Sequence, residues 1–302
     1  MDNQMNDIKP SAYLKEAIEN VLNKKIIQCV QPNFGLSAAL RYSIELEDKS
    51  KVFVKAATDD QTAGWLRTEH SVLASYQDNF MPEIINWIDE FVNFPILITQ
   101  DFSNAFWAAS DKGVHWRKGD IELLLDTVKK LSTIKGRHLL PKLENHNTGV
   151  WAKIAEDPEG FLKLKMCSGN WLMHSIDYLI EAESKVDKTG ETLVHGDIRS
   201  DNICIDGSRV VFVDWSNACI GSADHDLVNL LPTLHLEGGP DPFQIMPDAA
   251  SQAAALCATH IRRLSNDKSM PFWLKDVFKK LIAIELEWAA QCLHLDRPDG
   301  IK

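Results

Sequence analysis

Residues 193–216, LVHGDIRSDNICIDGSRVVFVDWS, contain two short apolar runs, ICID and RVVFVDW, that are joined at Asp206-Gly207. An Asp-Gly pair between two such runs favours a β-hairpin with a tight turn. A hairpin brings its two outer ends together, so the loop before the first run is expected to lie beside the residues that follow the second. We therefore expect the chemistry of the protein at these two ends.

Polar residues occupy both outer ends of the predicted hairpin. Asp197 and Asn202 lie in the loop HGDIRSDN, and Asp214 ends the second strand. Two carboxylates and an amide oxygen in one place form a hard oxygen site. Such a site suits Mg²⁺, which usually keeps several waters and is completed by substrate phosphates.

The segment TAGWLRTEHSVLASY, upstream of the hairpin, has helical periodicity, with Trp65 and Val72 on one apolar stripe. Glu69 lies on the same stripe, four residues after Trp65 and three before Val72. A carboxylate on the packed side of a helix needs a partner, because an unpaired buried charge is costly. The alternative is a carboxylate at the edge of the stripe.

The order of the elements predicts an α+β protein. Up to residue 101 the chain reads as helix, three strands, helix and two strands, and the short links favour an antiparallel arrangement in a five-stranded sheet. The remainder has mostly helical periodicity apart from the hairpin. We expect an N-terminal lobe, residues 1–101, and a C-terminal helical lobe, residues 102–302.

Composition favours a globular, cytoplasmic protein. Of the 302 residues 45% are hydrophobic, and 43 acidic against 32 basic side chains give a formal charge of -11, which disfavours nucleic acid and anionic membranes as partners. The six cysteines are scattered without metal-binding spacing, so we expect reduced thiols. The polar N-terminus is unlike a signal peptide, and no stretch reaches the length of a membrane span.

The pattern H-G-D-x-x-x-x-N followed by D-W-S resembles the catalytic and metal loops of the aminoglycoside phosphotransferase and choline kinase superfamily, relatives of the protein kinases. The resemblance implies a protein-kinase-like two-lobed fold, with a small antiparallel-sheet N-lobe and a larger, mainly helical C-lobe. It implies that Asp197 is the catalytic base, that Asn202 and Asp214 bind Mg²⁺, and that ATP is the phosphoryl donor.

The same resemblance suggests nucleotide-binding residues in the N-terminal lobe. Lys55, which ends the strand KVFVK, is the expected phosphate-binding lysine, and Glu69 is the partner that orients it. The turn QPNFGLSAA, which includes Gly35 and Ser37, is expected to cover the phosphates with backbone amides, although it has a single glycine.

The link between the lobes, TQDFSNAFW, is expected to lie against the adenine, with Gln100 and Phe102 among the cofactor-binding residues. Two features further along depart from the family pattern. Ser216 stands where a glycine usually follows the metal-binding Asp, and GSADHDL lacks the common Asp-Pro. These departures put the flexibility of the metal loop and the shape of the acceptor pocket in question.

Other polar residues have more than one interpretation. We expect His195 to be a packed scaffold under the loop rather than a second base. Arg199 either positions Asp197 or an acceptor group, or forms a solvent-facing salt bridge. Four C-terminal carboxylates either form an acidic wall for an amine-bearing acceptor or are ordinary surface groups. They are Glu237, Asp241, Glu285 and Glu287.

Together these features predict an ATP-dependent kinase that phosphorylates a hydroxyl of a small molecule, either an aminoglycoside-like antibiotic or an amino-alcohol or sugar metabolite. The motifs of P-loop and Rossmann nucleotide-binding proteins do not occur. The alternative is a catalytically silent, nucleotide-binding pseudokinase or partner-binding module, which has no physical need for a complete site. A third interpretation, a protein kinase, is disfavoured because little chain separates Asp214 from the next predicted helix.

Overall fold

The computed structural model describes residues 10–32, 39–89, 94–145 and 149–301. The chain divides into two compact units. The first unit comprises Met1–Leu131, Arg137–Pro141 and His195–Cys219, and the second comprises Ser132–Gly136, Lys142–Val194 and Ile220–Lys302. The hairpin therefore belongs to the same unit as the N-terminal elements. The lobe boundary after residue 101 stays a prediction.

Among its described residues, the first unit contains a five-stranded antiparallel sheet, three α-helices and the hairpin. Its helices are α1 (Ala12–Leu22), α2 (Asp60–Ser75) and α3 (Asp120–Leu131). The strands of the large sheet are β1 (Ile26–Val30), β2 (Leu40–Leu46), β3 (Lys51–Ala56), β4 (Ile84–Ile88) and β5 (Ile96–Gln100). Their order, β1-β2-β3-β5-β4, confirms the predicted five-stranded antiparallel sheet.

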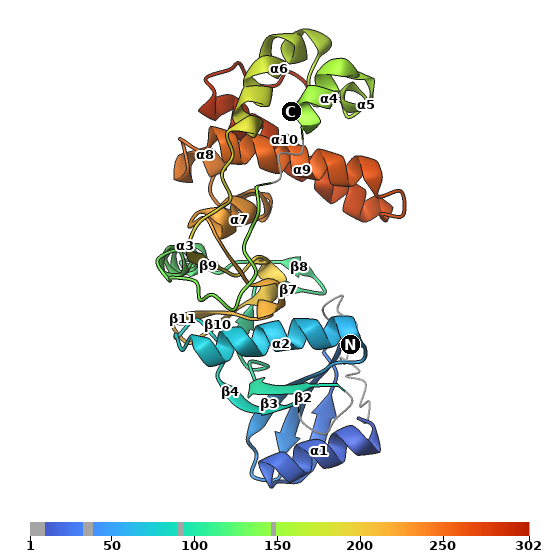
Figure 1. Cartoon of the computed structure of the whole chain (residues 1–302), viewed down its shortest axis with the longest axis vertical. Helices are drawn as coiled ribbons and strands as arrows, with labels where there is room; N and C mark the ends of the chain where they lie inside the picture. Colours follow the sequence, from blue (N-terminus) through green and yellow to red (C-terminus); the bar gives the residue numbers. More distant parts are fainter. Residues whose placement is uncertain (1–9, 33–38, 90–93, 146–148, 302) are drawn as a thin grey trace. The chain divides into compact units, whose positions relative to one another are not determined.

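The large sheet lies between α1 and α2 (Figure 1). Side chains alternate between the two faces of a strand, so Val52 and Val54 of β3 pack with Ile18 of α1 on one face. Lys55 consequently points to the other face, toward α2. Local capping fixes where α2 begins, since the Asp59 carboxylate accepts a hydrogen bond from the Thr62 amide in a capping box.

The predicted hairpin is present as β10 (Ile203–Asp206) and β11 (Arg209–Phe212), paired antiparallel. Gly207 has a φ of 64°, a conformation that glycine adopts without steric cost, so the Asp-Gly turn forms as the sequence predicts. The short strand β6 (Phe106–Trp107), which the periodicity did not predict, pairs with β10. A second short pair in this unit is β7 (Ala109–Ser110) with β8 (Gly113–Val114).

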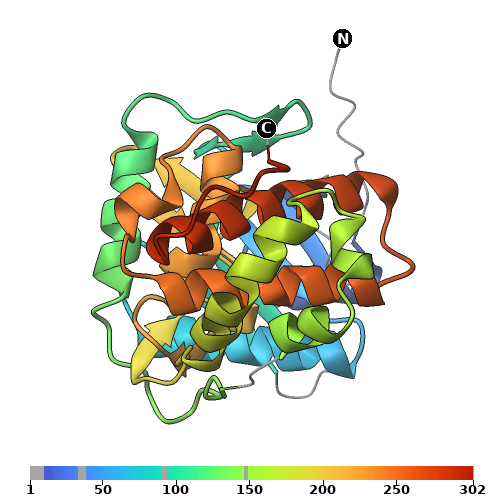
Figure 2. The same ribbon diagram turned by 90° about the horizontal axis from the view of Figure 1, so that it is seen from above.

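The second unit is mainly helical. Its helices are α4 (Val150–Glu156), α5 (Glu159–Leu162), α6 (Gly169–Ser184), α7 (His225–Leu236), α8 (Pro242–Ile245), α9 (Ala250–Asn266) and α10 (Phe272–Cys292). The strands β9 (Thr192–Val194) and β12 (Cys219–Gly221) pair where the chain passes between the units. Figure 2 shows the two long helices α9 and α10 side by side.

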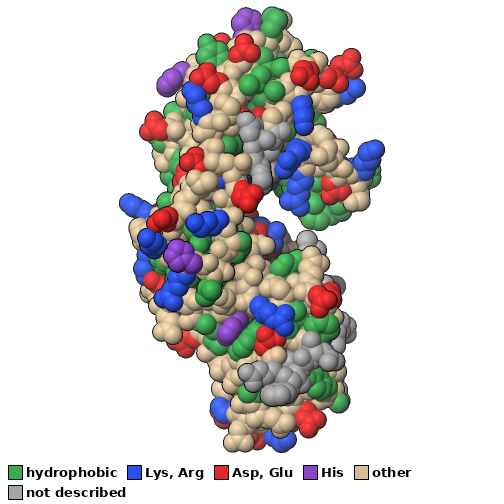
Figure 3. Space-filling view, in the orientation of Figure 1, with side chains coloured by type: hydrophobic (Ala, Val, Ile, Leu, Met, Phe, Trp, Pro, Cys, Tyr) green, Lys and Arg blue, Asp and Glu red, His purple; other side chains and the backbone are tan. Residues whose placement is uncertain are grey.

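In the second unit, backbone donors satisfy the buried Glu183. The Glu183 carboxylate accepts hydrogen bonds from the Val150 and Trp151 amides and thereby caps α4, which begins at a glycine without a capping side chain. The mix of an antiparallel sheet with helices confirms the predicted α+β class. No helix within the described ranges is long and apolar enough to cross a membrane. Acidic and basic side chains are interspersed on the face shown in Figure 3.

Candidate active site

Lys55 and Glu69 form a buried ion pair between β3 and α2. Lys55 Nζ lies 2.9 Å from Oε1 and 2.8 Å from Oε2 of Glu69, and the two side chains are only 12% and 4% exposed. Burial raises the pKa of Glu69, and the Lys55 ammonium opposes this shift. Lys55 is therefore the partner that the Glu69 carboxylate, on the apolar stripe of α2, was expected to need.

Asp214 joins this pair at the end of the hairpin. Its Oδ1 lies 3.1 Å from Lys55 Nζ, and its backbone is left-handed, with a φ of 68°. Burial opposes the charge on Lys55, but the Glu69 and Asp214 carboxylates outweigh it and raise the pKa of the ammonium. Burial likewise opposes ionisation of Asp214, yet Lys55 and the Ser216 hydroxyl lower its pKa. The site thus holds a cation between two carboxylates.

Gly196 and His195 shape the loop that carries Asp197. Gly196 has a φ of 79°, and a Cβ there would lie 2.6 Å from the backbone oxygen of Asn217, so a side chain would push the loop away from the metal-loop residues. His195 is fully buried, with Nε2 3.1 Å from the Val213 oxygen and Nδ1 3.3 Å from the Asp197 amide nitrogen.

These two contacts determine the tautomer of His195. A carbonyl can only accept and an amide N–H can only donate, so Nε2 carries the proton and Nδ1 is the acceptor. Burial lowers the pKa of His195 to about 4, which keeps the ring neutral near pH 7. This geometry agrees with the scaffold role expected for His195.

The Asp197 carboxylate is held by two neighbours. Its Oδ2 accepts a hydrogen bond from Asn202 Nδ2 at 3.1 Å, and its Oδ1 lies 3.4 Å from Arg199 Nε. Burial raises the pKa of Asp197 above its usual value, while Arg199 opposes this shift. Arg199 also pairs with Asp201 at 2.9 Å and is half exposed, so both alternatives raised for it, an Asp197 contact and a solvent-facing salt bridge, occur together.

The donor set fits a magnesium site of the type completed by phosphates. The Asn202 amide nitrogen donates to the Asp197 backbone and side chain, which leaves the amide oxygen as the atom that can bind a metal. The Val213 amide donates to the Asn202 carbonyl at 3.0 Å, so Asn202 lies next to the residue preceding Asp214. Within the described residues no group of three or more His, Cys, Asp or Glu is arranged to hold a metal.

At the predicted adenine link, some backbone groups already form hydrogen bonds within the protein. The Gln100 amide donates to the Glu83 carbonyl at 2.9 Å, and the Phe102 carbonyl accepts from the Ala105 amide and the Trp107 indole, each at 3.0 Å. These groups are therefore not free for a nucleotide. The side chain of Gln100 instead has a buried Oε1 without a hydrogen-bond partner in the described structure.

Asp101 shows the same feature, since its Oδ2 is also buried and lacks a hydrogen bond to any described residue. Two adjacent unsatisfied acceptors at the link are unusual, because buried polar atoms are nearly always paired. They fit a donor supplied by a bound molecule, such as an exocyclic amino group. Gly35 and Ser37, predicted to cover the phosphates, lie outside the described residues.

Sequence reasoning missed one buried carboxylate and misassigned its environment. Glu285 was grouped with acidic-wall or surface residues, but it is completely buried in α10 and contacts His260 of α9. The signal was available, because Glu285 follows Phe278, Leu281 and Ile282 on one helical stripe, as Glu69 follows Trp65. Cys204 is fully buried with a pKa raised to about 12 by burial, which agrees with an inert thiol.

Comparison with known proteins gives a family match over part of the chain and fold matches over nearly all of it. Residues 171–265 match the model of the phosphotransferase enzyme family. Among solved structures, a thermostable mutant of aminoglycoside phosphotransferase APH(4)-Ia in ternary complex with ADP and hygromycin B has 13% identity and a TM-score of 0.52, covering 96% of this chain and 98% of that one. No curated protein sequence gives a significant match.

Two further structures have the same fold. A macrolide 2'-phosphotransferase type I has 15% identity and a TM-score of 0.52, with 92% of this chain and 99% of that one covered. A choline/ethanolamine kinase family protein from Mesorhizobium loti has 12% identity and a TM-score of 0.53, with 88% and 91% covered. The match over residues 171–265 and the shared protein-kinase-like fold confirm the predicted resemblance to the aminoglycoside phosphotransferase and choline kinase superfamily.

Proposed function

We propose that the protein transfers the γ-phosphoryl group of ATP to a hydroxyl of a small molecule, with Asp197 as the base. The observation that carries the proposal is the arrangement of the first unit, in which Lys55 links Glu69 to Asp214 while Asn202 holds the Asp197 carboxylate. Phosphoryl transfer requires positioning and countercharge more than covalent chemistry, and these residues supply both.

Each side chain has a separate role in the proposed reaction. Asp197 accepts the proton of the acceptor hydroxyl, and its raised pKa makes it a stronger base than an exposed aspartate. Lys55 binds the phosphates that are not transferred, and the bidentate contact with Glu69 fixes the ammonium before the nucleotide arrives. Asn202 and Asp214 are the proposed Mg²⁺ ligands. The bound metal would neutralise phosphate oxygens.

Support for a nucleotide and a small-molecule acceptor comes from the fold neighbours. The APH(4)-Ia structure contains ADP and hygromycin B, and another neighbour is a complex of an aminoglycoside phosphotransferase with GDP and kanamycin. We propose a nucleotide-binding N-terminal lobe, residues 1–101, and an acceptor-binding helical lobe, residues 102–302. The acceptor classes proposed are aminoglycoside-like antibiotics, amino alcohols and sugars.

The first experiment measures ADP formation from Mg-ATP with a panel of aminoglycosides, macrolides, choline, homoserine and sugars. Asp197→Asn is the blank, and Asp201→Asn is the matched control, because Asp201 lies on the same loop but pairs with Arg199 in solvent. Turnover that is lost in Asp197→Asn and kept in Asp201→Asn supports the proposal. Turnover retained by Asp197→Asn contradicts it.

A binding experiment separates an active kinase from a silent one. Asp214→Ala should weaken Mg²⁺-dependent binding of a non-hydrolysable ATP analogue, whereas Asp206→Asn at the hairpin turn should not. Mg²⁺-dependent binding without turnover for any acceptor would favour the pseudokinase alternative. Equal binding by the Asp214→Ala variant and the wild type would refute the metal site.

A further inference from the structure

The second unit contains a cavity of about 400 Å³ with a strongly cationic wall. Lys142, Lys188 and Arg262 line it, and Glu144 is the single carboxylate among the lining residues. His225, at the first position of α7, lies between this cavity and a smaller adjoining one of about 70 Å³ that also includes Lys188. None of these residues belongs to the proposed catalytic machinery.

Two carboxylates partly offset the cations of this cavity, since Glu144 lines it and Glu183 opposes the lowering of the Lys188 pKa. Within the described part of the chain, no ion pair is formed by Lys142, Lys188 or Arg262. Burial lowers the pKa of Lys188, and the nearby Arg262 lowers it further by like-charge repulsion. Lys188 is half-buried, whereas Lys142 and Arg262 are exposed, so the like-charge repulsion acts mainly on Lys188 and an anion would relieve it.

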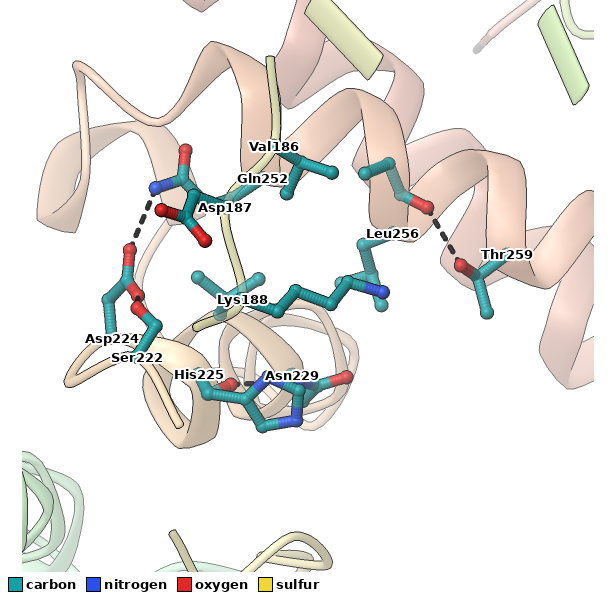
Figure 4. Close-up of a pocket in the computed structure, with 12 residues that line it drawn as sticks. Val186, Asp187, Lys188, Ser222, Asp224, His225, Asn229, Gln252, Leu256 and Thr259 are labelled. Carbon is teal, nitrogen blue, oxygen red and sulfur yellow. Dashed lines mark hydrogen bonds between the residues drawn. The ribbon is translucent and has the colours of Figure 1, made fainter. Parts of the chain in front are cut away.

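The nearby aspartates are occupied by neutral donors instead of these cations. Asp187 accepts hydrogen bonds from the amide and hydroxyl of Thr189 and from Asn145. Asp224 accepts from Ser222 and, at 2.8 Å, from Gln252. Figure 4 shows the Lys188 side chain extending across the pocket away from both carboxylates.

The backbone holds Lys188 in place. The Lys188 amide donates to the Asn145 side chain at 2.6 Å, and its carbonyl accepts from the Ser222 amide at 2.9 Å. A Cβ at Gly221 would lie 3.1 Å from the Lys188 carbonyl oxygen and 2.5 Å from Leu143, so the segments pack closely. The base of the side chain is thus fixed before any ligand binds, which lowers the entropic cost of binding.

We propose that this cavity binds the phosphate group of a small molecule, with Lys188 and Arg262 as the main contacts and Lys142 at its wall. A dianion matches three cationic side chains opposed by one carboxylate. Thr259 of α9 also lines the cavity, but its hydroxyl donates to the Ala255 carbonyl at 2.8 Å, so the cations remain the main contacts. The volume exceeds that needed by inorganic phosphate alone, so the ligand is a phosphate monoester rather than the free ion.

The test is calorimetric titration of the full chain with inorganic phosphate and with glycerol 3-phosphate, at constant ionic strength maintained with chloride. Lys188→Gln and Arg262→Gln should each weaken binding by about tenfold or more. Arg263→Gln is the matched control, because Arg263 is the next residue on α9 but lies over the Phe278 ring and does not line the cavity. It should bind like the wild type.

Two further measurements make the result decisive. In phosphate-free buffer, Lys188→Gln and Arg262→Gln should unfold at the same temperature as the wild type or a higher one, because each removes repulsion. Phosphate binding should survive in Lys55→Met/Glu69→Leu. The proposal would be overturned if the wild type bound neither inorganic phosphate nor glycerol 3-phosphate. It would also be overturned if only the double variant Lys55→Met/Glu69→Leu lost phosphate binding. Tighter binding of inorganic phosphate than of glycerol 3-phosphate would refute a monoester ligand.

Discussion

Two buried glutamates, one in each unit, have different surroundings. Glu69 of α2 has both carboxylate oxygens hydrogen-bonded to the Lys55 ammonium, at 2.9 and 2.8 Å. Glu285 of α10 has Oε1 2.7 Å from His260 Nδ1, while its Oε2 is buried and has no partner among the described residues. The first carboxylate is fully satisfied, and the second is half satisfied.

We infer that the difference separates a charge of the proposed active site from a structural one. Glu69 belongs to a chain of contacts that reaches Asp214 and the catalytic loop, so its burial serves to position Lys55. Glu285 joins α9 to α10 through a single contact, and nothing in the described structure extends that contact to the catalytic loop. We therefore expect changes near Glu69 to alter nucleotide binding, and changes near Glu285 to alter stability alone.

The largest effect is expected for Lys55→Met. The substitution leaves the Glu69 carboxylate buried without its cation, so the free energy of unfolding should fall by about 3–5 kcal/mol. Turnover should fall at least ~100-fold, because a preorganised countercharge for the phosphates is lost. Urea unfolding and ADP formation measure the two losses. Wild-type turnover in this variant would show that Lys55 has no part in the reaction.

The double variant Lys55→Met/Glu69→Leu sharpens this prediction. Replacing both members of a buried pair by apolar residues is often neutral for stability, so most of the lost unfolding free energy should return. Turnover should not return, since the phosphates still lack the ammonium. Recovery of both properties would mean that the pair acts only through folding.

A smaller effect is expected for His260→Ala in the second unit. The change removes the hydrogen bond to Glu285 and leaves a buried acceptor unsatisfied, which should lower the free energy of unfolding by about 1–3 kcal/mol. Affinity for an ATP analogue should stay at the wild-type value. His174→Ala, at an exposed position of α6, serves as the control. A large loss of nucleotide affinity in His260→Ala would remove the distinction between the two glutamates.

The pH dependence of stability tests the same pair. Burial raises the pKa of Glu285, so above pH ~4.5 the folded protein binds more protons at this group than the unfolded chain does. Its contribution to stability is therefore fully present at lower pH and is lost as the pH rises through the folded-state pKa. Glu285→Gln should gain stability relative to the wild type over this range, as measured by urea unfolding at several pH values. A difference that is independent of pH would contradict this assignment.

The smallest effect is expected for Arg199→Gln, at a half-exposed ion pair. Arg199 opposes the raised pKa of Asp197, so its loss should raise that pKa further and move the acid limb of the kcat/KM profile to higher pH. Turnover near neutral pH should fall by less than about fivefold, because exposed pairs contribute little. Arg209→Gln, which loses a pair at the hairpin turn, should leave the limb in place. If the acid limb of the kcat/KM profile stayed in place in Arg199→Gln, Arg199 would not influence the pKa of Asp197.

Much of the fold and of the candidate site could be predicted because the signals are local. Short apolar runs bounded by turn residues located the five strands of the large sheet, and Asp206-Gly207 located the hairpin turn. The position of Glu69 on an apolar stripe required a buried cation, and the structure supplies Lys55. Short pieces such as β6 and β12 carry too few residues for a periodicity and form only because a partner strand is nearby.

The sequence alone determined the types of element, the hairpin and the set of residues at its ends, since spacing along the chain decides these. Tertiary structure alone decided which partner each buried charge has, because Lys55 and Asp214 are 159 positions apart and meet only when the sheet and hairpin fold together. It also brought Lys188 and Arg262 to one cavity that a single carboxylate lines, a result of packing between segments that no pattern in the sequence encodes.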